Sequence, residues 1–125
     1  MESKPKILIV EDEPDIVEIL KMALTKTGYE VDCAYDGEEA LEKVKNFKPD
    51  LILLDLMIPK IDGATVNIKL KENPETANIP VIVVTGKGNL KEFLNLKEGV
   101  TIAGYYEKPI KVKFLLEKIN AFFEK

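Results

Sequence analysis

Residues 51–63 read Leu-Ile-Leu-Leu-Asp-Leu-Met-Ile-Pro-Lys-Ile-Asp-Gly, so that four consecutive apolar residues run directly into an aspartate, Asp55. A short run that is apolar at every position is typical of a strand covered on both faces, as in a parallel sheet. Two other runs have the same character, Ile-Leu-Ile-Val at 7–10 and Val-Ile-Val-Val at 81–84. These runs predict a buried parallel sheet.

Segments with helical and strand patterns alternate on both sides of this stretch. The predicted strands are Lys6–Val10, Glu30–Ala34, Leu51–Leu54, Val81–Val84 and Ile102–Tyr106. Apolar residues at helical spacing predict five helices: one from Pro14 that ends before Gly28, then Gly37–Phe47, Gly63–Glu72, Asn89–Glu98 and Lys111–Phe123. Only Glu30–Ala34 alternates apolar and polar residues, which indicates a strand near an edge. The pattern predicts an α/β fold in which helices cover both faces of a doubly wound, five-stranded parallel sheet.

Length and composition exclude several classes of protein. A chain of 125 residues fits one domain spanning 1–125. It has no His and a single Cys, Cys33, which excludes Ser-His-Asp and Cys-His catalysis, His-ligated metal sites, disulfides and Cys-x-x-Cys pairs. The net charge of −4 argues against nucleic acid or an anionic membrane as the main partner. No signal peptide or membrane-spanning run is visible, so we expect a cytoplasmic protein.

Polar side chains follow four of the predicted strands. The acidic triplet 11–13 follows the first strand, Asp55 the third, Thr85 the fourth and Lys108 the fifth. In an open parallel sheet, ligands bind at the carboxyl ends of the strands. We therefore expect these groups to meet at one edge of the sheet.

Each of these groups has an ordinary structural explanation when taken alone. The triplet precedes Pro14 and suits the start of a helix, Thr85 suits a strand end, and Lys108 suits a solvated surface. Asp55 is harder to explain in this way, because a carboxylate beside a buried strand needs a partner.

Together, the groups suit a site that binds a divalent cation and a phosphoryl group. Mg²⁺ would relieve the repulsion between neighbouring carboxylates, while Lys and Thr would bind phosphoryl oxygens. A carboxylate can also act as the nucleophile.

Four motifs in this order resemble those of one family. They are Glu11-Asp-Glu-Pro14, Asp55-Leu-Met-Ile-Pro-Lys-Ile-Asp-Gly63, Asn78-Ile-Pro-Val-Ile-Val-Val-Thr85 and Tyr105-Tyr-Glu-Lys-Pro109. From end to end the chain resembles a CheY-like, single-domain response-regulator receiver domain of two-component signalling. The resemblance implies a flavodoxin-like (βα)5 fold with strand order 2-1-3-4-5.

The resemblance also implies a phosphorylation site. Asp55 would be the phosphoacceptor, taking its phosphoryl group from a phosphohistidine on a sensor histidine kinase or a histidine phosphotransfer protein. Glu11, Asp12 and Asp55 would hold Mg²⁺ together with the backbone carbonyl of Met57. By this resemblance the protein is not an enzyme in the usual sense, because it would catalyse only its own phosphorylation and dephosphorylation.

The remaining implied roles concern switching. Lys108 would pair with the phosphoryl oxygens, Thr85 would hydrogen-bond to the phosphoryl group, and Tyr105 would move between exposed and buried positions. The partner-binding face would change as a result, towards a protein target that the sequence does not identify. The resemblance is compatible with a monomer or with a dimer that forms on phosphorylation.

The chain departs from the family pattern at three places. Glu11 stands where Asp is commoner, so it would reach a metal through water. Gly86 follows Thr85 where Ala is usual, and Lys87 lies close enough in sequence to affect how water reaches the site. Residues 99–105 are spaced more widely than usual, which predicts a short or irregular fourth helix and an altered output face.

Three alternatives remain beside this interpretation. The chain could be a receiver-fold binding module that signals without phosphorylation. It could be a phosphatase with an aspartate nucleophile, although Met57 stands where such an enzyme needs a general acid. A flavodoxin-like electron carrier has the same fold, but the acidic triplet 11–13 would repel the FMN phosphate.

Overall fold

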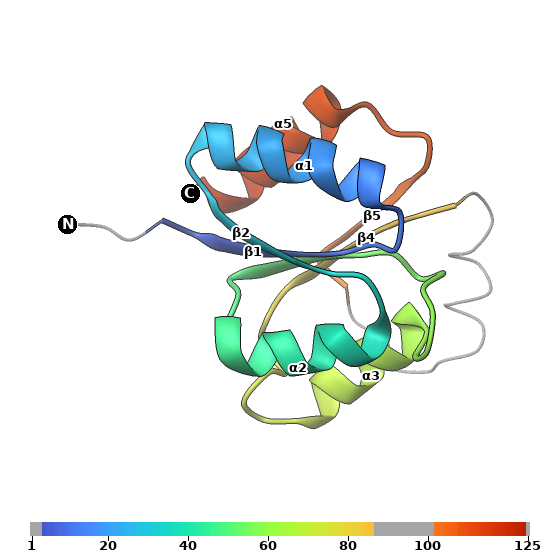
Figure 1. Ribbon diagram of the computed structural model, residues 1–125. Coiled ribbons are helices and arrows are strands. Elements are labelled where there is room, and N and C mark those ends of the chain that lie inside the picture. The colour runs from blue at the N-terminus through green and yellow to red at the C-terminus, as the bar shows by residue number, and fades with distance from the viewer. Residues whose placement is uncertain (1–3, 87–101, 125) are drawn as a thin grey trace.

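A computed structural model describes residues 4–86 and 102–124 of the chain. Within these residues, five strands form a single parallel sheet in the order β2-β1-β3-β4-β5 (Figure 1). The strands are β1 (Lys6–Val10), β2 (Glu30–Ala34), β3 (Leu51–Leu54), β4 (Val81–Thr85) and β5 (Gly104–Glu107). The predicted fold class and strand order are confirmed, and β2 lies at an edge as its alternating pattern predicted.

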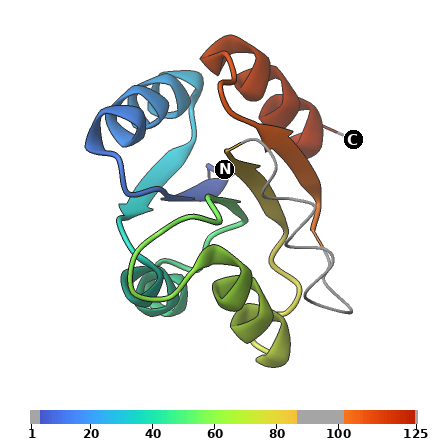
Figure 2. The same ribbon diagram turned by 90° about the vertical axis from the view of Figure 1, so that its right-hand side faces the viewer.

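Helices cover both faces of the sheet in the described part of the chain. They are α1 (Pro14–Thr27), α2 (Gly37–Phe47), α3 (Gly63–Glu72) and α5 (Val112–Phe123). In both views α1 and α5 lie on one face, and α2 and α3 on the other (Figures 1 and 2). The helix predicted at Asn89–Glu98 lies outside the described residues, as do Lys87 and the first three residues, 99–101, of the widely spaced segment 99–105.

The core divides into two halves, one on each face of the sheet. Alternate residues of β1 point to opposite halves: Ile7 and Ile9 pack in the cluster that contains Leu115 of α5, and Leu8 and Val10 in the cluster of α2 and α3. All four are at most 1% exposed. This two-sided burial explains why the run is apolar at every position, since neither face of the strand contacts water.

Short polar signals set the ends of the helices. Pro14 is the first residue of α1, and Gly28 ends that helix in a left-handed conformation with φ of 114°. The side chains of Asp36 and Asp62 cap α2 and α3 by accepting hydrogen bonds from the backbone N–H groups of Glu39 and Thr65. The loops from β2 to α2 and from β3 to α3 therefore end at these two capping residues.

The fifth strand differs from its predicted bounds. Ile102–Tyr106 was the prediction, whereas β5 pairs with β4 over Gly104–Glu107. Ile102 is apolar because it packs against the α2–α3 half of the core, and it precedes the strand. Two smaller differences are that β4 extends to Thr85 and that Lys111 precedes α5 as its N-cap.

None of the helices in residues 4–86 and 102–124 has the length and apolar character needed to cross a membrane.

Candidate functional site

Strand register places the acidic groups side by side at the carboxyl edge of the sheet, which faces the viewer in Figure 2. Val10 of β1 is paired with Leu54 of β3, so the residues that follow them, Glu11 and Asp55, become neighbours. The Asp55 N–H donates to the carbonyl of Val10 at 3.0 Å, and the Glu11 N–H donates to the carbonyl of Ala34 at 3.0 Å. The backbone positions of both acids are therefore set by the pairing of β1 with β2 and β3.

The two strands beyond β3 deliver a hydroxyl and an ammonium group. Thr85 is the last residue of β4 and pairs with Glu107 of β5. The Lys108 N–H donates to the Thr85 carbonyl at 2.7 Å, which continues this pairing by one residue. Lys108 thus leaves the sheet beside Thr85, within side-chain reach of the acids on β1 and β3.

Asp55 receives hydrogen bonds from three different parts of the chain. Its Oδ1 accepts from the Thr85 hydroxyl at 2.7 Å and from the Met57 N–H at 3.0 Å. Its Oδ2 accepts from the Lys108 ammonium at 2.8 Å. Asp55 is 6% exposed and Thr85 is fully buried, so these bonds take the place of water around the carboxylate. The partner that a buried carboxylate requires is therefore present.

Glu11 makes contacts of the same kind. Its Oε1 accepts from the Lys108 ammonium at 2.6 Å, and its Oε2 accepts from the Glu13 N–H at 3.2 Å. Burial raises the pKa of Glu11 above its ordinary value of 4.5; the hydrogen bond from Lys108 opposes this and the charge of Asp55 adds to it. Glu13 is the N-cap of α1 but makes no side-chain capping bond. Simple helix capping therefore does not account for the acidic triplet.

Lys108 bridges the two buried acids. Burial lowers the pKa of its ammonium group, but the hydrogen bonds to Asp55 and Glu11 outweigh burial, so that the pKa lies above its ordinary value. The side chain is only 22% exposed, whereas an ordinary surface lysine is largely solvated. Lys108 is thus a fixed positive charge at the centre of the site.

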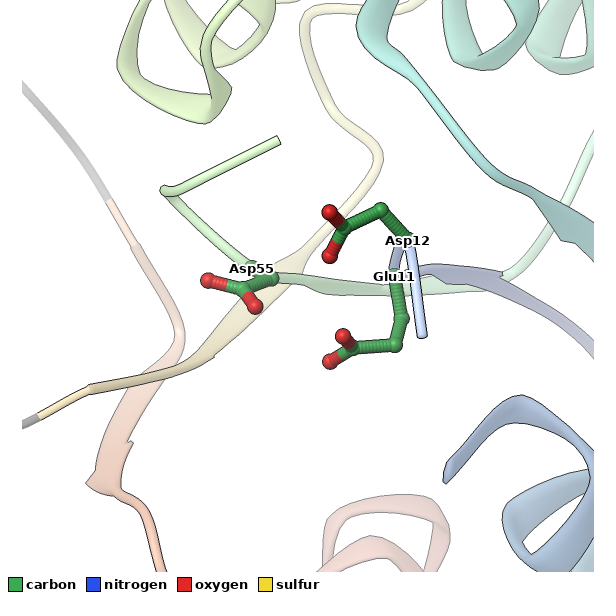
Figure 3. A group of neighbouring side chains, drawn as sticks. All are labelled: Glu11, Asp12 and Asp55. Atoms are coloured by element: carbon green, nitrogen blue, oxygen red, sulfur yellow. The ribbon is translucent and has the colours of Figure 1, made fainter. Parts of the chain in front are cut away.

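Three carboxyl groups meet at this edge. Glu11, Asp12 and Asp55 each offer an oxygen atom within 4.8 Å of the other two, and Figure 3 shows their side chains gathered at the ends of β1 and β3. Glu11 and Asp55 are buried, while Asp12 is exposed. Carboxylate oxygens are the donors that Mg²⁺ prefers, and an exposed ligand leaves room for the waters that this ion retains. The residues therefore fit a magnesium ion.

An apolar cavity of about 430 Å³ adjoins the acids on the side of α1 and α5. Aliphatic side chains line it, among them Ile16 and Leu20 of α1 and Leu115 of α5. This lining keeps one side of Glu11 and Asp55 away from polar groups.

The structure thus brings together most of the residues predicted from the sequence: Glu11, Asp12, Asp55, Thr85 and Lys108. The Met57 N–H contacts Asp55, whereas its side chain is 65% exposed. Tyr105 lies on β5 and packs, partly buried, against the α2–α3 half of the core. It is therefore next to the site along the strands but outside the cluster of carboxylates. The metal, acceptor and switch roles of these residues stay predictions.

Two features of the site were not predicted. One is the bridge from Lys108 to Glu11, because no local pattern links residues 97 positions apart. The other is the close packing of Gly63: a Cβ there would contact the carbonyl oxygen of Asp55 and lie 2.6 Å from the Cα of Leu56. The motif ending in Gly63 contained the residue, but its spacing did not show why glycine is needed.

Comparison with known proteins agrees with this geometry. Residues 7–120 match the family model described as the response regulator receiver domain. The chain is 35% identical over 122 residues to the DNA-binding dual master transcriptional regulator RpaA of Synechocystis, covering 97% of this chain and 50% of that protein. It is 37% identical over 121 residues to the alkaline phosphatase synthesis transcriptional regulatory protein PhoP of Bacillus subtilis, covering 96% and 49%. The chain spans about half the length of these relatives.

Solved structures give the same result for the fold. The chemotaxis response regulator CheY4 of Vibrio cholerae superposes with a TM-score of 0.85 at 26% identity, covering 95% of this chain and 98% of that one. A CheY-like response regulator receiver domain protein of Methanospirillum hungatei superposes with a TM-score of 0.83 at 32% identity, covering 96% and 94%.

Proposed function

Since this chain belongs to the response regulator receiver domain family of two-component signalling, we propose that it is a phosphoacceptor switch in which Asp55 is the acceptor. The observation that carries the proposal is the setting of Asp55, a nearly buried carboxylate contacted by a hydroxyl, a backbone N–H and an ammonium group. In the reaction, an Asp55 oxygen attacks the phosphorus of a phosphohistidine. The new P–O bond forms as the P–N bond breaks, and the histidine nitrogen leaves with the bonding electrons.

Glu11, Asp12 and Asp55, with the backbone carbonyl of Met57, would hold Mg²⁺ at this edge. When bound, the ion supplies positive charge that neutralises the carboxylates and the incoming phosphoryl oxygens. Lys108 supplies a second positive charge, and it can exchange its bond with Asp55 for one with a phosphoryl oxygen. Positioning and charge neutralisation are the main requirements of phosphoryl transfer, and the residues of this site supply both. The proposed catalysis is limited to the chain's own phosphorylation and dephosphorylation.

The raised pKa of Glu11 predicts a pH-dependent magnesium affinity. Protons compete with a cation for a carboxylate, and Glu11 takes up its proton at a higher pH than an ordinary glutamate does. As the pH falls, the affinity for Mg²⁺ should therefore begin to drop at a higher pH than it would with an unperturbed glutamate as ligand. Calorimetric titrations of the wild type and of Glu11→Gln measure this. The variant should bind more weakly at pH 7 and show a flatter pH dependence; an equally steep fall in both proteins would contradict the assignment.

Thr85→Ala is expected to separate phosphorylation from switching. The substitution removes the hydroxyl that lies 2.7 Å from Asp55, a hydrogen bond to a charged group worth about 1.5–3 kcal/mol. Asp55 remains able to accept the phosphoryl group, but the group loses its link to β4 and, through β4, to Tyr105 of β5. Intact mass should still show phosphorylation, while NMR should show much smaller shifts at Tyr105 than in the wild type.

Thr76→Ala is the matched control for this experiment. Thr76 is also buried, and its hydroxyl donates to the Leu70 carbonyl at 2.7 Å in a loop far from the acids in sequence. This variant should keep both phosphorylation and the Tyr105 response. Wild-type shifts at Tyr105 in Thr85→Ala would contradict the role of Thr85.

We propose a sensor histidine kinase or a histidine phosphotransfer protein as the donor, a protein as the output target, and the cytoplasm as the location. The curated relatives are transcriptional regulators, one of them described as DNA-binding, and the match covers about half of each. Nucleic-acid contacts therefore form no part of the proposal for these residues. Either a monomer or a dimer formed on phosphorylation is compatible with it.

Incubation with a small phosphodonor and Mg²⁺, followed by intact mass, tests the proposed function. The wild type should gain the mass of one phosphoryl group in a magnesium-dependent manner. A chain that gains no mass, yet folds and binds Mg²⁺, would instead be a binding module that uses the receiver fold without phosphorylation.

A further inference from the structure

The loop from β3 to α3, residues 55–62, lies directly against the first residue of α2. A Cβ atom on Gly37 would contact the carbonyl oxygen of Ile61 and lie 2.7 Å from both the carbonyl carbon and the Cβ of Ile61. The Gly37 N–H also donates to the Pro59 carbonyl at 3.1 Å. Because these neighbours are mainly backbone, they cannot turn aside as a flexible side chain could. Any larger residue at this position must displace the loop or the helix.

The backbone of the loop is shaped to make this contact. Lys60 has a φ of 70°, a left-handed conformation that L-residues rarely adopt, and the Ile61 N–H donates to the Pro59 carbonyl at 2.8 Å. The Lys60 ammonium lies 3.5 Å from a carboxylate oxygen of Glu38 and 3.7 Å from one of Asp36, both at the start of α2. The tight reversal at Lys60 thus presents Pro59 and Ile61 to α2.

The other end of the loop is equally confined. The Gly63 N–H donates to the Leu56 carbonyl at 2.9 Å, and Gly63 has no room for a Cβ beside Asp55 and Leu56. Between these anchors lies Met57, whose N–H donates to Asp55 Oδ1 at 3.0 Å. Because the end of the loop at Gly63 is held in place, a displacement of Ile61 is expected to move the part of the loop that contains Met57.

We propose that Gly37, through its contact with Pro59 and Ile61, is a positioning residue for the phosphorylation site. The contact sets the conformation of the loop and, with it, the placement of the Met57 carbonyl and the Asp55 carboxylate. Mg²⁺ demands near-ideal octahedral geometry, so a small shift of either group lowers its affinity. The inference rests on the proposed function for its biological meaning. Its effects on Mg²⁺ affinity and on the conformation of the loop can nevertheless be measured without phosphorylation.

Gly28→Ala is the matched control for Gly37→Ala. Gly28 ends α1 with φ of 114°, and a Cβ there would have nothing within 4 Å. Alanine at this position destabilises the fold through backbone strain alone, which lowers the melting temperature, and contacts no part of the site. A general loss of stability therefore appears in both variants, whereas a positioning effect appears only in Gly37→Ala.

The test compares the wild type, Gly37→Ala and Gly28→Ala by three measurements: the melting temperature, the NMR shift of the Met57 amide without Mg²⁺, and the Mg²⁺ dissociation constant from calorimetry. Gly37→Ala should shift the Met57 amide and weaken Mg²⁺ binding roughly 10-fold or more, as loss of outer-shell support does at other metal sites. Gly28→Ala should lower the melting temperature and leave both other quantities at wild-type values. The same Met57 amide shift and the same Mg²⁺ dissociation constant in Gly37→Ala and Gly28→Ala would overturn the proposal.

Lys60→Met provides a second test of the positioning role if Gly37→Ala does not fold. The Lys60 side chain is 60% exposed, so its replacement leaves the core intact. Removal of a positive charge alone would tighten Mg²⁺ binding, whereas a loosened loop weakens it. A weaker affinity with a shifted Met57 amide supports the positioning role, and a tighter or unchanged affinity overturns it.

The outcomes also separate this inference from the proposed function. If the wild type is phosphorylated and Gly37→Ala behaves as Gly28→Ala does, only the positioning role fails. If the wild type binds Mg²⁺ but accepts no phosphoryl group, the proposed function fails, and the Met57 shift and the affinity still decide the positioning role. If the wild type binds no Mg²⁺, both fail.

Discussion

Asp55→Asn should abolish phosphoryl acceptance while the melting temperature stays the same or rises. An amide is not a nucleophile towards phosphorus, so the wild-type gain in mass should disappear completely. The fold should not suffer, because the substitution removes one of two nearly buried negative charges that share the single ammonium group of Lys108. The charges of Glu11 and Lys108 then balance. The amide oxygen still accepts from Thr85 and Met57, and Lys108, which loses its acceptor at position 55, keeps its bond to Glu11.

Intact mass after incubation with a phosphodonor and Mg²⁺, together with thermal unfolding, checks this prediction. Asp15→Asn is the matched control, since Asp15 is an exposed aspartate in the first turn of α1, near the same edge of the sheet. That variant should be phosphorylated as the wild type is. Undiminished phosphorylation of Asp55→Asn would place the acceptor elsewhere. A sharply lower melting temperature would show that the Asp55 charge stabilises the fold, contrary to the charge balance described above.

Lys108→Met should both slow phosphorylation and destabilise the protein. Glu11 and Asp55 are 4% and 6% exposed, and removal of the shared ammonium group leaves two buried carboxylates without a counter-charge. Removing one partner of a buried ion pair typically costs about 3–5 kcal/mol, so we expect a loss of about 3 kcal/mol in the free energy of unfolding at neutral pH without Mg²⁺. Phosphorylation slows because no fixed cation faces the phosphoryl oxygens.

The pH dependence of this loss identifies its cause. Without Lys108, the pKa of Glu11 rises further above its ordinary value in the folded state, because burial and the charge of Asp55 are no longer opposed by the hydrogen bond from Lys108. A carboxyl group whose pKa is higher in the folded state than in the unfolded state binds its proton more readily when folded, so lowering the pH stabilises the folded state. The loss of stability in Lys108→Met relative to the wild type should therefore shrink as the pH falls from about 7 to about 5. Glu11→Gln in the Lys108→Met background should also recover part of the lost stability.

Urea unfolding at several pH values measures these effects, with Lys113→Met as the control. Lys113 is an exposed lysine of α5, and its replacement should change stability little at any pH. A deficit in Lys108→Met that does not vary with pH would mean that lost packing of the aliphatic stem, and not the uncompensated carboxylates, explains the destabilisation.

Much of this architecture could be predicted because the signals are local. Continuous apolar runs such as Leu51–Leu54 indicate burial on both faces of a strand, and Gly28 indicates the end of a helix because glycine readily adopts the left-handed conformation found there. The convergence of Asp55, Thr85 and Lys108 followed from one rule, that parallel strands deliver their carboxyl ends to the same edge.

The remainder depends on contacts that no local pattern reports. Ile102 looked like a strand residue because apolar character alone does not distinguish pairing from packing. The close approach of Gly37 to Ile61 depends on how α2 and the loop after β3 meet in space, and the sequence around Gly37 shows only a helix start. The Lys108–Glu11 bridge likewise arises from the order of the strands in the sheet.

The most direct test of the central claim is to locate the phosphoryl group chemically. Wild-type protein is incubated with a phosphodonor and Mg²⁺, reduced with borohydride, which converts an aspartyl phosphate into homoserine, and digested for peptide mass spectrometry. The account predicts homoserine at position 55 and at no other acidic residue. Homoserine at Asp12 or another carboxyl, or a phosphorylated chain that yields none, would contradict it.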